Sequence, residues 1–196
     1  MTALLIILVS YFIGSIPFGL VGKFFFKIKD PRTFGSKNIG ATNILRSGNK
    51  KAAAFTLFFD MFKGFLAVFI SSYVDNDFIY LAILSVVFGH IFPIYLFFKG
   101  GKGVATFLGA LLSYSAVVGG LTLFTWITVF YFTRKSSVAG ISSIILSNFF
   151  LFLFCDDIAV NVAVLLLSIF VLFKHLENIK RLLKKEELSF EGRDKN

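Results

Sequence analysis

Seven predominantly apolar runs occupy most of the sequence and restrict it to one kind of fold. They cover residues 3–22, 53–74, 78–98, 104–116, 118–133, 138–154 and 158–174. A helix that crosses a bilayer needs about 20 apolar residues and tolerates about 17, and most of these runs reach that length. We therefore predict an all-α fold, a polytopic bundle of about seven transmembrane helices, with residues 1–196 forming a single integral membrane domain.

Two runs contain features that interrupt a helix. Residues 104–133 are too many for one straight span and few for two, and Ser-Tyr-Ser at 113–115 and Gly119 with Gly120 would serve as its turn. Two short helices are expected here, and five full spans with a re-entrant pair are the alternative. In the first run, Pro17 is expected to kink or end the helix. That run lacks a small-residue cleavage site, which favours a retained span over a signal peptide.

The distribution of charge predicts the orientation. Residues 23–51 carry eight lysines and arginines against one aspartate, whereas the loops on the other side contain Asp75, Asp77, Asp156 and Asp157 and no basic residue. The positive-inside rule then places the N-terminus outside and the C-terminus in the cytoplasm. The net charge is +9, and the basic residues lie beside membrane spans. Their expected binding partners are therefore anionic lipid and a phosphorylated substrate rather than nucleic acid. The predicted cytoplasmic loops are residues 23–52, 99–104, 134–137 and 174–196.

A glycine- and lysine-rich segment follows the third run. Gly100, Gly101 and Gly103 lack a Cβ and could let backbone N–H groups converge on an anion, and Lys99 and Lys102 would add positive charge. The segment is thus a candidate phosphate or carboxylate site. The alternative is a plain turn between two helices, with its lysines among lipid head groups.

Two further polar segments are predicted on the same side. Residues 35–46 combine glycines with hydroxyl and amide groups, and the candidate ligands there are Asn38, Thr42, Asn43 and Arg46. At the end of the last run, His175, Asn178 and Arg181 are spaced by three and share one helix face. An amphipathic tail lying on the bilayer would show the same spacing.

Asp60, Lys63 and His90 are ionisable residues within apolar runs. Asp60 and Lys63 stand three apart, so they can pair on one helix face. We expect this pair to be structural rather than to bind substrate. His90 is expected to be a packed, hydrogen-bonded supporting residue rather than a catalyst.

Several sharper motifs are excluded. Lys102 is followed by Gly103 rather than by Ser or Thr, which is wrong for a nucleotide-binding P-loop. Tyr95 stands where a His-x4-Asp acyltransferase motif starting at His90 would need an aspartate. Two histidines and Cys155 in separate segments make a metal centre improbable, so no metal and no cofactor are expected.

Four motifs lie in order along the chain: residues 15–19 (Ser-Ile-Pro-Phe-Gly), 35–43 (Gly-Ser-Lys-Asn-Ile-Gly-Ala-Thr-Asn), 89–93 with 99–106, and 175–182. Together they resemble the bacterial acyl-phosphate:glycerol-3-phosphate acyltransferases, over residues 8 to about 187. Lys37 departs from the family pattern, which has glycine there, and this is expected to reshape the loop slightly.

The resemblance implies transfer of a fatty acyl group from acyl phosphate to the 1-position of glycerol 3-phosphate. The products would be lysophosphatidic acid and phosphate, formed without coenzyme A, carrier protein or nucleotide. The resemblance adds Ser36, Ser137 and Asn178 to the pocket, and the expected catalytic set becomes Ser36, Lys102, His175 and Asn178.

The residues suit this chemistry because an acyl phosphate already carries a good leaving group and needs only positioning, charge neutralisation and a proton acceptor. We expect Lys102 and the amides of residues 100–103 to hold the leaving phosphate. Arg46, Thr42 and Asn43 are expected to hold glycerol phosphate. The proton could pass to His175 or to an oxygen of the acyl phosphate.

The expected setting is the bacterial plasma membrane, with the active site facing the cytoplasm and a soluble acyl-phosphate synthase as a possible transient partner. The acyl chain would lie between helices against a wall of phenylalanines. A transporter of phosphate esters or other anions is the competing function. Transporters commonly carry broken helices that meet near the bilayer midplane, whereas the polar segments of this chain all map to one face.

Overall fold

The structure, a computed structural model, describes residues 1–190, and within them it contains helices and no β-strand. The first half of the chain forms α1 (Thr2–Ser15), α2 (Phe18–Phe26), η1 (Pro31–Thr33), α3 (Ala41–Leu45), α4 (Lys50–Val74), η2 (Asn76–Phe78), α5 (Ile79–Ile91) and η3 (Ile94–Leu96). The second half forms α6 (Val104–Tyr114), α7 (Ala116–Thr133), α8 (Ser136–Phe154), α9 (Ile158–Lys174) and α10 (Leu176–Leu183).

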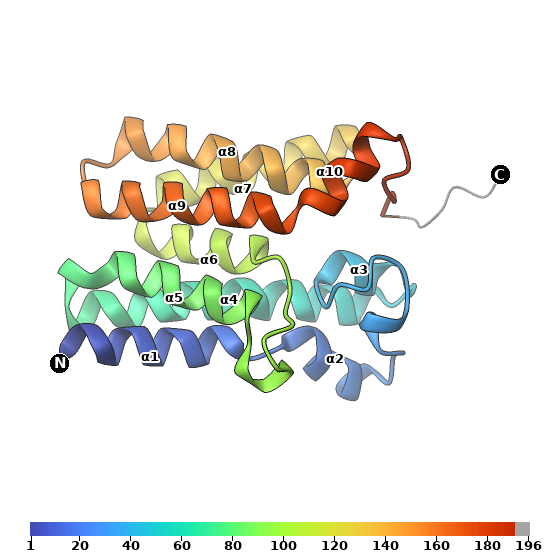
Figure 1. The fold of residues 1–196 in the computed structure, drawn as a ribbon, viewed down its shortest axis with the longest axis horizontal. Coiled ribbons are helices and arrows are strands. Elements are labelled where there is room, and N and C mark those ends of the chain that lie inside the picture. Colours follow the sequence, from blue (N-terminus) through green and yellow to red (C-terminus); the bar gives the residue numbers. More distant parts are fainter. Residues whose placement is uncertain (191–196) are drawn as a thin grey trace.

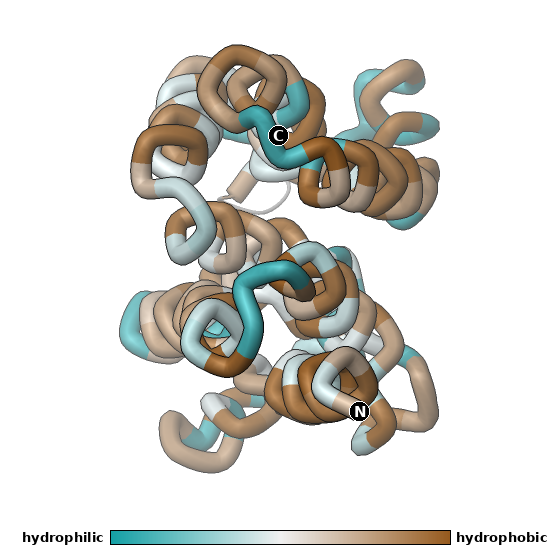
Figure 2. The backbone as a smooth tube through the Cα atoms, turned by 90° about the vertical axis from the view of Figure 1, so that its left-hand side faces the viewer, coloured by the Kyte–Doolittle hydropathy of each residue, from teal (hydrophilic) through white to brown (hydrophobic). Residues whose placement is uncertain are grey.

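The long helices lie side by side in two groups (Figure 1). One group contains α1, α4 and α5, the other contains α7, α8 and α9, and α6 lies between them in contact with α4 and α7. Viewed from the end that carries the N-terminus, the two groups are seen along their helix axes (Figure 2). Most residues along the tube have hydrophobic side chains in this view, as expected for helices that face either one another or lipid.

Glycines set the spacing of the first group. A Cβ on Gly14 would lie 2.1 Å from the carbonyl oxygen of Val86, so α1 and α5 pack backbone to backbone. A Cβ on Gly64 would lie 2.0 Å from the carbonyl oxygen of Thr106, and α4 meets α6 in the same way. Small residues are the usual means of close helix packing in a membrane, where no hydrophobic force drives helices together.

The helix lengths confirm a membrane bundle and correct some of the expected boundaries. Within residues 1–190, five helical segments are long and apolar enough to span a bilayer, or six if the bent pair α9–α10 counts as one. The number seven therefore remains a prediction, because α6 has only 11 residues. The expected run 78–98 was wrong at its end, since α5 stops at Ile91, two residues before Pro93.

The division of residues 104–133 is confirmed, but only one of the two expected turns exists. Helix α6 ends at Tyr114, and Ser115 caps α7 by accepting a hydrogen bond from the Val118 amide at 3.3 Å. Gly119 was wrongly expected in the turn. It lies inside α7, and its missing Cβ would come within 2.4 Å of the Leu112 backbone, so the glycine lets α7 return closely along α6.

The first span breaks at Pro17, as expected, and a buried ion pair on α4 stabilises the break. The Lys63 ammonium lies 2.8 Å from the Asp60 carboxylate, and both side chains are almost fully buried. The same ammonium donates a hydrogen bond of 2.8 Å to the carbonyl of Ile16, which the interrupted helix leaves without its usual partner. The structure thus confirms that Asp60 and Lys63 pair.

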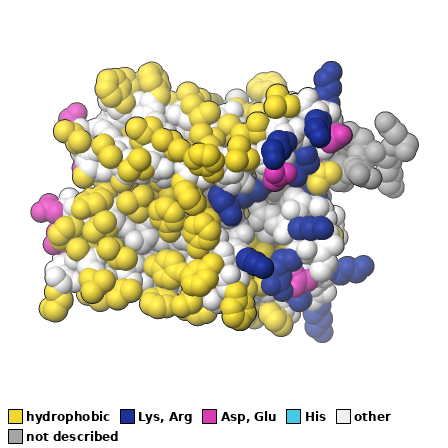
Figure 3. Space-filling view, in the orientation of Figure 1, with side chains coloured by type: hydrophobic (Ala, Val, Ile, Leu, Met, Phe, Trp, Pro, Cys, Tyr) yellow, Lys and Arg dark blue, Asp and Glu magenta, His cyan; other side chains and the backbone are white. Residues whose placement is uncertain are grey.

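Charge is separated along the helix axes. Lysines and arginines gather at the end of the molecule that carries α2, α3 and α10, whereas acidic side chains are visible at the opposite end (Figure 3). Asp75 and Asp77 follow α4, and Asp156 and Asp157 join α8 to α9 at that opposite end. The fold therefore places the predicted polar segments together at one end of the bundle.

Candidate active site

A cavity of about 240 Å³ opens at the basic end of the bundle. Its polar side is formed by residues from segments that are far apart in the sequence, which the fold brings together. Lining residues expected from the sequence are Ser36, Asn38, Thr42, Asn43, Arg46, Lys102, Gly103, Ser137, His175 and Asn178.

Three expected site residues do not line this cavity: Lys99, Gly100 and Gly101. Lys99 is exposed, and the two glycines serve a different purpose. A Cβ on Gly100 would lie 2.1 Å from the carbonyl oxygen of His90, and one on Gly101 would lie 2.1 Å from its imidazole Nε2. The loop packs directly on the end of α5, and this close packing requires glycine at residues 100 and 101. A contact with phosphate is not needed to explain these two glycines.

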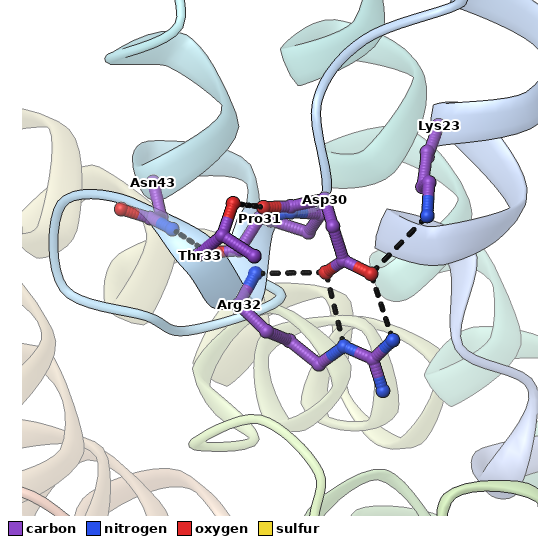
Figure 4. Close-up of polar contacts among 6 residues, drawn as sticks. All are labelled: Lys23, Asp30, Pro31, Arg32, Thr33 and Asn43. Carbon is purple, nitrogen blue, oxygen red and sulfur yellow. Dashed lines mark hydrogen bonds and ion pairs between the residues drawn. The ribbon is translucent and has the colours of Figure 1, made fainter.

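The segment before α3 is held by an ionic cluster (Figure 4). The Asp30 carboxylate accepts hydrogen bonds from Arg32 at 2.7 and 3.0 Å and from Lys23 at 3.2 Å. The side-chain hydrogen bond from Arg32 is the main reason why the pKa of Asp30 lies well below its ordinary value. The cluster ties the segment to α2 and leaves residues 34–46 positioned against the bundle.

Asn43 holds the rest of this loop together. Its amide nitrogen donates to the carbonyls of Pro31, Phe34 and Asn38, at 2.7, 3.2 and 2.8 Å, and its amide oxygen accepts from the Ser36 backbone at 2.9 Å. Figure 4 shows the side chain directed at Pro31. Asn43 is 2% exposed and makes all these bonds within the loop, so it shapes the site. Its expected contact with glycerol phosphate stays a prediction.

Lys37 takes the backbone conformation of the glycine that it replaces. Its φ is +57°, in the left-handed region that a side chain disfavours and glycine adopts readily. Lys37 therefore carries local backbone strain, and the expected slight reshaping of the loop stays a prediction.

The start of α6 faces the cavity with unpaired backbone donors. Gly103 adopts φ +87° and precedes the helix, and Gly103, Val104 and Ala105 all line the cavity. The first N–H groups of a helix have no partner within it, and they attract anions. Lys102 adds a full positive charge directly beside them.

The bend between α9 and α10 supplies the third part of the site. The two helices meet at 56°, and His175 stands at the break and lines the cavity. Its Nδ1 lies 2.8 Å from the carbonyl oxygen of Val171. Because a carbonyl can only accept, Nδ1 carries the proton in the neutral ring and Nε2 keeps its lone pair.

Asn178 links the positive and negative groups of the site. Its amide oxygen accepts a hydrogen bond from the Lys102 ammonium, and its amide nitrogen donates to the Glu187 carboxylate at 2.6 Å. Arg181 also donates to this carboxylate, at 2.8 Å. The spacing of His175, Asn178 and Arg181 thus brings them to one place, as the sequence predicted.

Burial and neighbouring charges shift the pKa values of the basic side chains in the site. Burial is the main cause that lowers the pKa of Lys102 to about 8, and Arg181, Arg46 and Lys174 lower it further while Glu187 opposes them. Burial likewise lowers the pKa of Arg46. A phosphate entering this site would be drawn to several cations that are poorly hydrated and therefore attract it strongly.

The sequence reasoning missed some lining residues. Glu187 lies in a charged tail, where nothing distinguished it from Glu186. Phenylalanines such as Phe58 and Phe152 lie on the exposed outer faces of the helices and do not line the cavity. The expected phenylalanine wall for the acyl chain stays a prediction. The apolar side of the cavity comes from Leu57, Met61, Leu108, Leu123, Trp126 and Ile127.

Comparison with known proteins decides the family. The family model described as glycerol-3-phosphate acyltransferase matches residues 4–185, nearly the whole chain. The chain belongs to the glycerol-3-phosphate acyltransferase family. Curated relatives with that name include one from Bartonella quintana, 42% identical over 97% of this chain and 93% of its own length, and one from Nitrosospira multiformis, 42% identical over 95% and 96%.

Two solved structures of the integral membrane acyltransferase PlsY share the fold of this acyltransferase. One is described as the glycerol 3-phosphate form, with a TM-score of 0.91, 34% identity and 96% of each chain covered. The other is described as the lysophosphatidic acid form, with a TM-score of 0.89, 33% identity and coverage of 96% and 95%. The chain is thus an integral membrane acyltransferase with the PlsY fold.

Proposed function

We propose that this acyltransferase uses acyl phosphate as its donor and acylates the 1-hydroxyl of glycerol 3-phosphate. The observation that carries the proposal is the cavity itself, in which Lys102, Arg46 and the start of α6 meet beside an apolar wall. A site for two phosphates and the head of an acyl chain needs this combination. The PlsY structures described with glycerol 3-phosphate and with lysophosphatidic acid support both the acceptor and the product.

In this reaction the 1-hydroxyl oxygen attacks the acyl carbon and the bond from that carbon to the phosphate oxygen breaks. Phosphate is a good leaving group, so the chain needs no covalent nucleophile. Lys102 and the α6 N-terminus stabilise the charge that builds on the departing phosphate. Arg46 binds glycerol phosphate through two parallel hydrogen bonds, and Ser36, Thr42 and Ser137 complete the pocket.

His175 is the group of this chain that accepts the hydroxyl proton. Its Nδ1 is engaged by Val171, so the Nε2 lone pair is free to act as the base. Asn178 holds the Lys102 ammonium in place. Because His175 stands at the α9–α10 bend and Asn178 lies in the first turn of α10, that bend aligns proton transfer with charge neutralisation.

The proposed setting is the bacterial plasma membrane, with the basic end of the bundle in the cytoplasm. The positive-inside rule and the acidic residues at the other end support this orientation. Glycerol 3-phosphate and a transiently docked soluble acyl-phosphate synthase would then both approach from the cytoplasm.

The donor is tested with purified protein and labelled glycerol 3-phosphate, supplied with either acyl phosphate or acyl-coenzyme A. Lysophosphatidic acid should form with acyl phosphate and not with acyl-coenzyme A. Product formed from acyl-coenzyme A alone would disprove the proposed donor. Flux of glycerol 3-phosphate into sealed vesicles without turnover on either donor would favour a transporter instead.

The two phosphate positions are separated by a contrast between Lys102 and Arg46. Lys102→Ala should lower kcat by about 10²-fold or more at any substrate concentration, because its interaction strengthens in the transition state. Arg46→Lys keeps the charge but loses the paired hydrogen bonds, so the KM for glycerol 3-phosphate should rise about tenfold with a smaller change in kcat. Steady-state kinetics that vary each substrate measure both, and a Lys102 variant restored by more glycerol 3-phosphate would reverse the assignment.

A further inference from the structure

Residues 186–190, named here the C-terminal strap, cross the mouth of the proposed phosphate site. Helix α10 ends at Leu183, and Lys185 adopts φ +60°, which turns the chain back on itself. The Glu186 amide then donates to the carbonyl of Arg181 at 2.8 Å. The strap therefore runs back along α10 instead of away from the protein.

The far end of the strap is attached to the opposite side of the mouth. The Phe190 amide donates to the carbonyl of Arg134 at 3.3 Å, in the connection between α7 and α8. The Phe190 ring lies 5.7 Å from that of Phe130, and the Arg134 guanidinium lies 5.7 Å from the Phe190 ring. Both ends of the strap are thus held, with Glu187 between them.

The strap occupies Arg46, a donor that the proposed function assigns to phosphate, and two donors close to it. The Arg46 guanidinium donates to the carbonyls of Leu188 and Ser189 at 3.2 and 3.1 Å. The Glu187 side chain is 3% exposed and accepts from Asn178 and Arg181. Two carbonyl groups therefore stand where Arg46 would hold phosphate oxygens, and a carboxylate lies beside them.

The electrostatics of Glu187 fit an occupant of an anion site. Burial alone would raise the pKa of this carboxyl, but hydrogen bonds from Asn178 and Arg181 lower it below its ordinary value. Glu187 is accordingly charged at neutral pH and partly neutralises Lys102 and Arg46. A substrate phosphate must either displace this charge or bind against its repulsion.

We propose that the strap is an internal competitor for the phosphate site and that Glu187 makes the site selective for phosphate monoesters. A phosphate monoester carries a charge of about −1.5 to −2 near pH 7, so it gains electrostatic energy when it replaces a single carboxylate. A lipid phosphodiester or a fatty acid carries one negative charge and gains little. The surrounding anionic lipids are thereby kept from filling the site.

This inference rests on the proposed positions of the two phosphates, and Glu187→Gln tests it because glutamine keeps the shape of the side chain and removes its charge. The variant should bind glycerol 3-phosphate at least about threefold more tightly in calorimetry on detergent-solubilised protein. Inhibition by oleate should strengthen by a larger factor, so that discrimination between the two anions falls. Glu186→Gln, which alters an exposed neighbour, is the matched control and should change neither. Equal or weaker binding of glycerol 3-phosphate by the Glu187 variant would overturn the proposal.

Displacement of the strap is measured in a separate experiment, so that the proposal can still be tested if the Glu187 variant folds poorly. In a Cys155→Ser background, the maleimide reaction of Leu188→Cys should accelerate when glycerol 3-phosphate or inorganic phosphate saturates the site. If at least one anion binds and neither anion raises the rate, the strap remains in place and the proposal is wrong. Acceleration by phosphate but not by glycerol 3-phosphate would keep the strap proposal and remove the proposed acceptor. Binding of neither anion would remove both.

Discussion

At the scale of single residues, Gly101 is explained by the imidazole of His90, and this gives a prediction. Gly101→Ala would place a Cβ 2.1 Å from Nε2, and overpacking of this kind costs about 1–3 kcal/mol of stability. Thermal unfolding should show the loss, and adding His90→Ala should restore part of it, as a positive coupling in a double-mutant cycle.

Gly120→Ala is the matched control, because no atom lies within 4 Å of a Cβ at Gly120. Its stability should match that of the unaltered chain. If Gly101→Ala leaves stability unchanged but weakens phosphate binding, the glycine serves the substrate after all.

The residues of the site could be predicted from the sequence where chemistry and spacing agree. Arg46, Lys102 and His175 combine charge with glycine-rich or helical surroundings, and the fold brings them together as expected. The Asn43 side chain points into the loop because three carbonyl groups converge on it there. The sequence around Asn43 does not predict this convergence. Glu187 reaches the site only because the chain reverses after α10.

At the scale of elements, the buried ion pair should hold α4 to the break between α1 and α2. Lys63→Met removes the lysine partner of the Asp60 carboxylate and one of the donors to the carbonyl of Ile16. The expected loss is about 3–5 kcal/mol, or a fall of about 10 °C in Tm, measured by thermal unfolding in detergent.

Two comparisons make this test specific. Lys51→Met, which removes an exposed lysine at the start of the same helix, should leave Tm nearly unchanged. Asp60→Asn combined with Lys63→Met should recover part of the loss, because no unpaired charge remains. Equal shifts for Lys51→Met and Lys63→Met would show that the pair is not structural.

The helix boundaries that sequence patterns predicted best are those marked by proline or charge. The break at Pro17 appears in the structure where it was expected. Apolar character alone extended the expected third run to residue 98, because residues 92–98 remain apolar after the helix has ended. Gly119 resembles a turn residue in sequence. In the structure it is glycine because the Leu112 backbone packs closely against it, and this contact appears only once α6 and α7 are paired.

At the scale of the whole molecule, the separation of charge predicts a topology that can be measured. In a Cys155→Ser background, Asn76→Cys and Val117→Cys should react with an impermeant maleimide on intact cells. Ser47→Cys and Lys184→Cys should react only after permeabilisation, because they lie at the basic end. All four positions are exposed, so differences in reaction report the side of the membrane. External reaction at Ser47→Cys would invert the proposed orientation and place the site outside the cell.

The size of the cavity has a consequence for the composition of the membrane. At about 240 Å³, it is smaller than the roughly 300–1,000 Å³ of pockets that enclose a drug-sized ligand, and two phosphates would use much of it. Its apolar wall on α7 runs from Leu123 to Ile127, about 6 Å of helix at 1.5 Å per residue. Most of a long acyl chain must therefore lie among lipid tails. The cavity then does not enclose the full length of the chain and does not select for it. The lengths of the chains that the enzyme installs would then be set by whichever reaction supplies the donor.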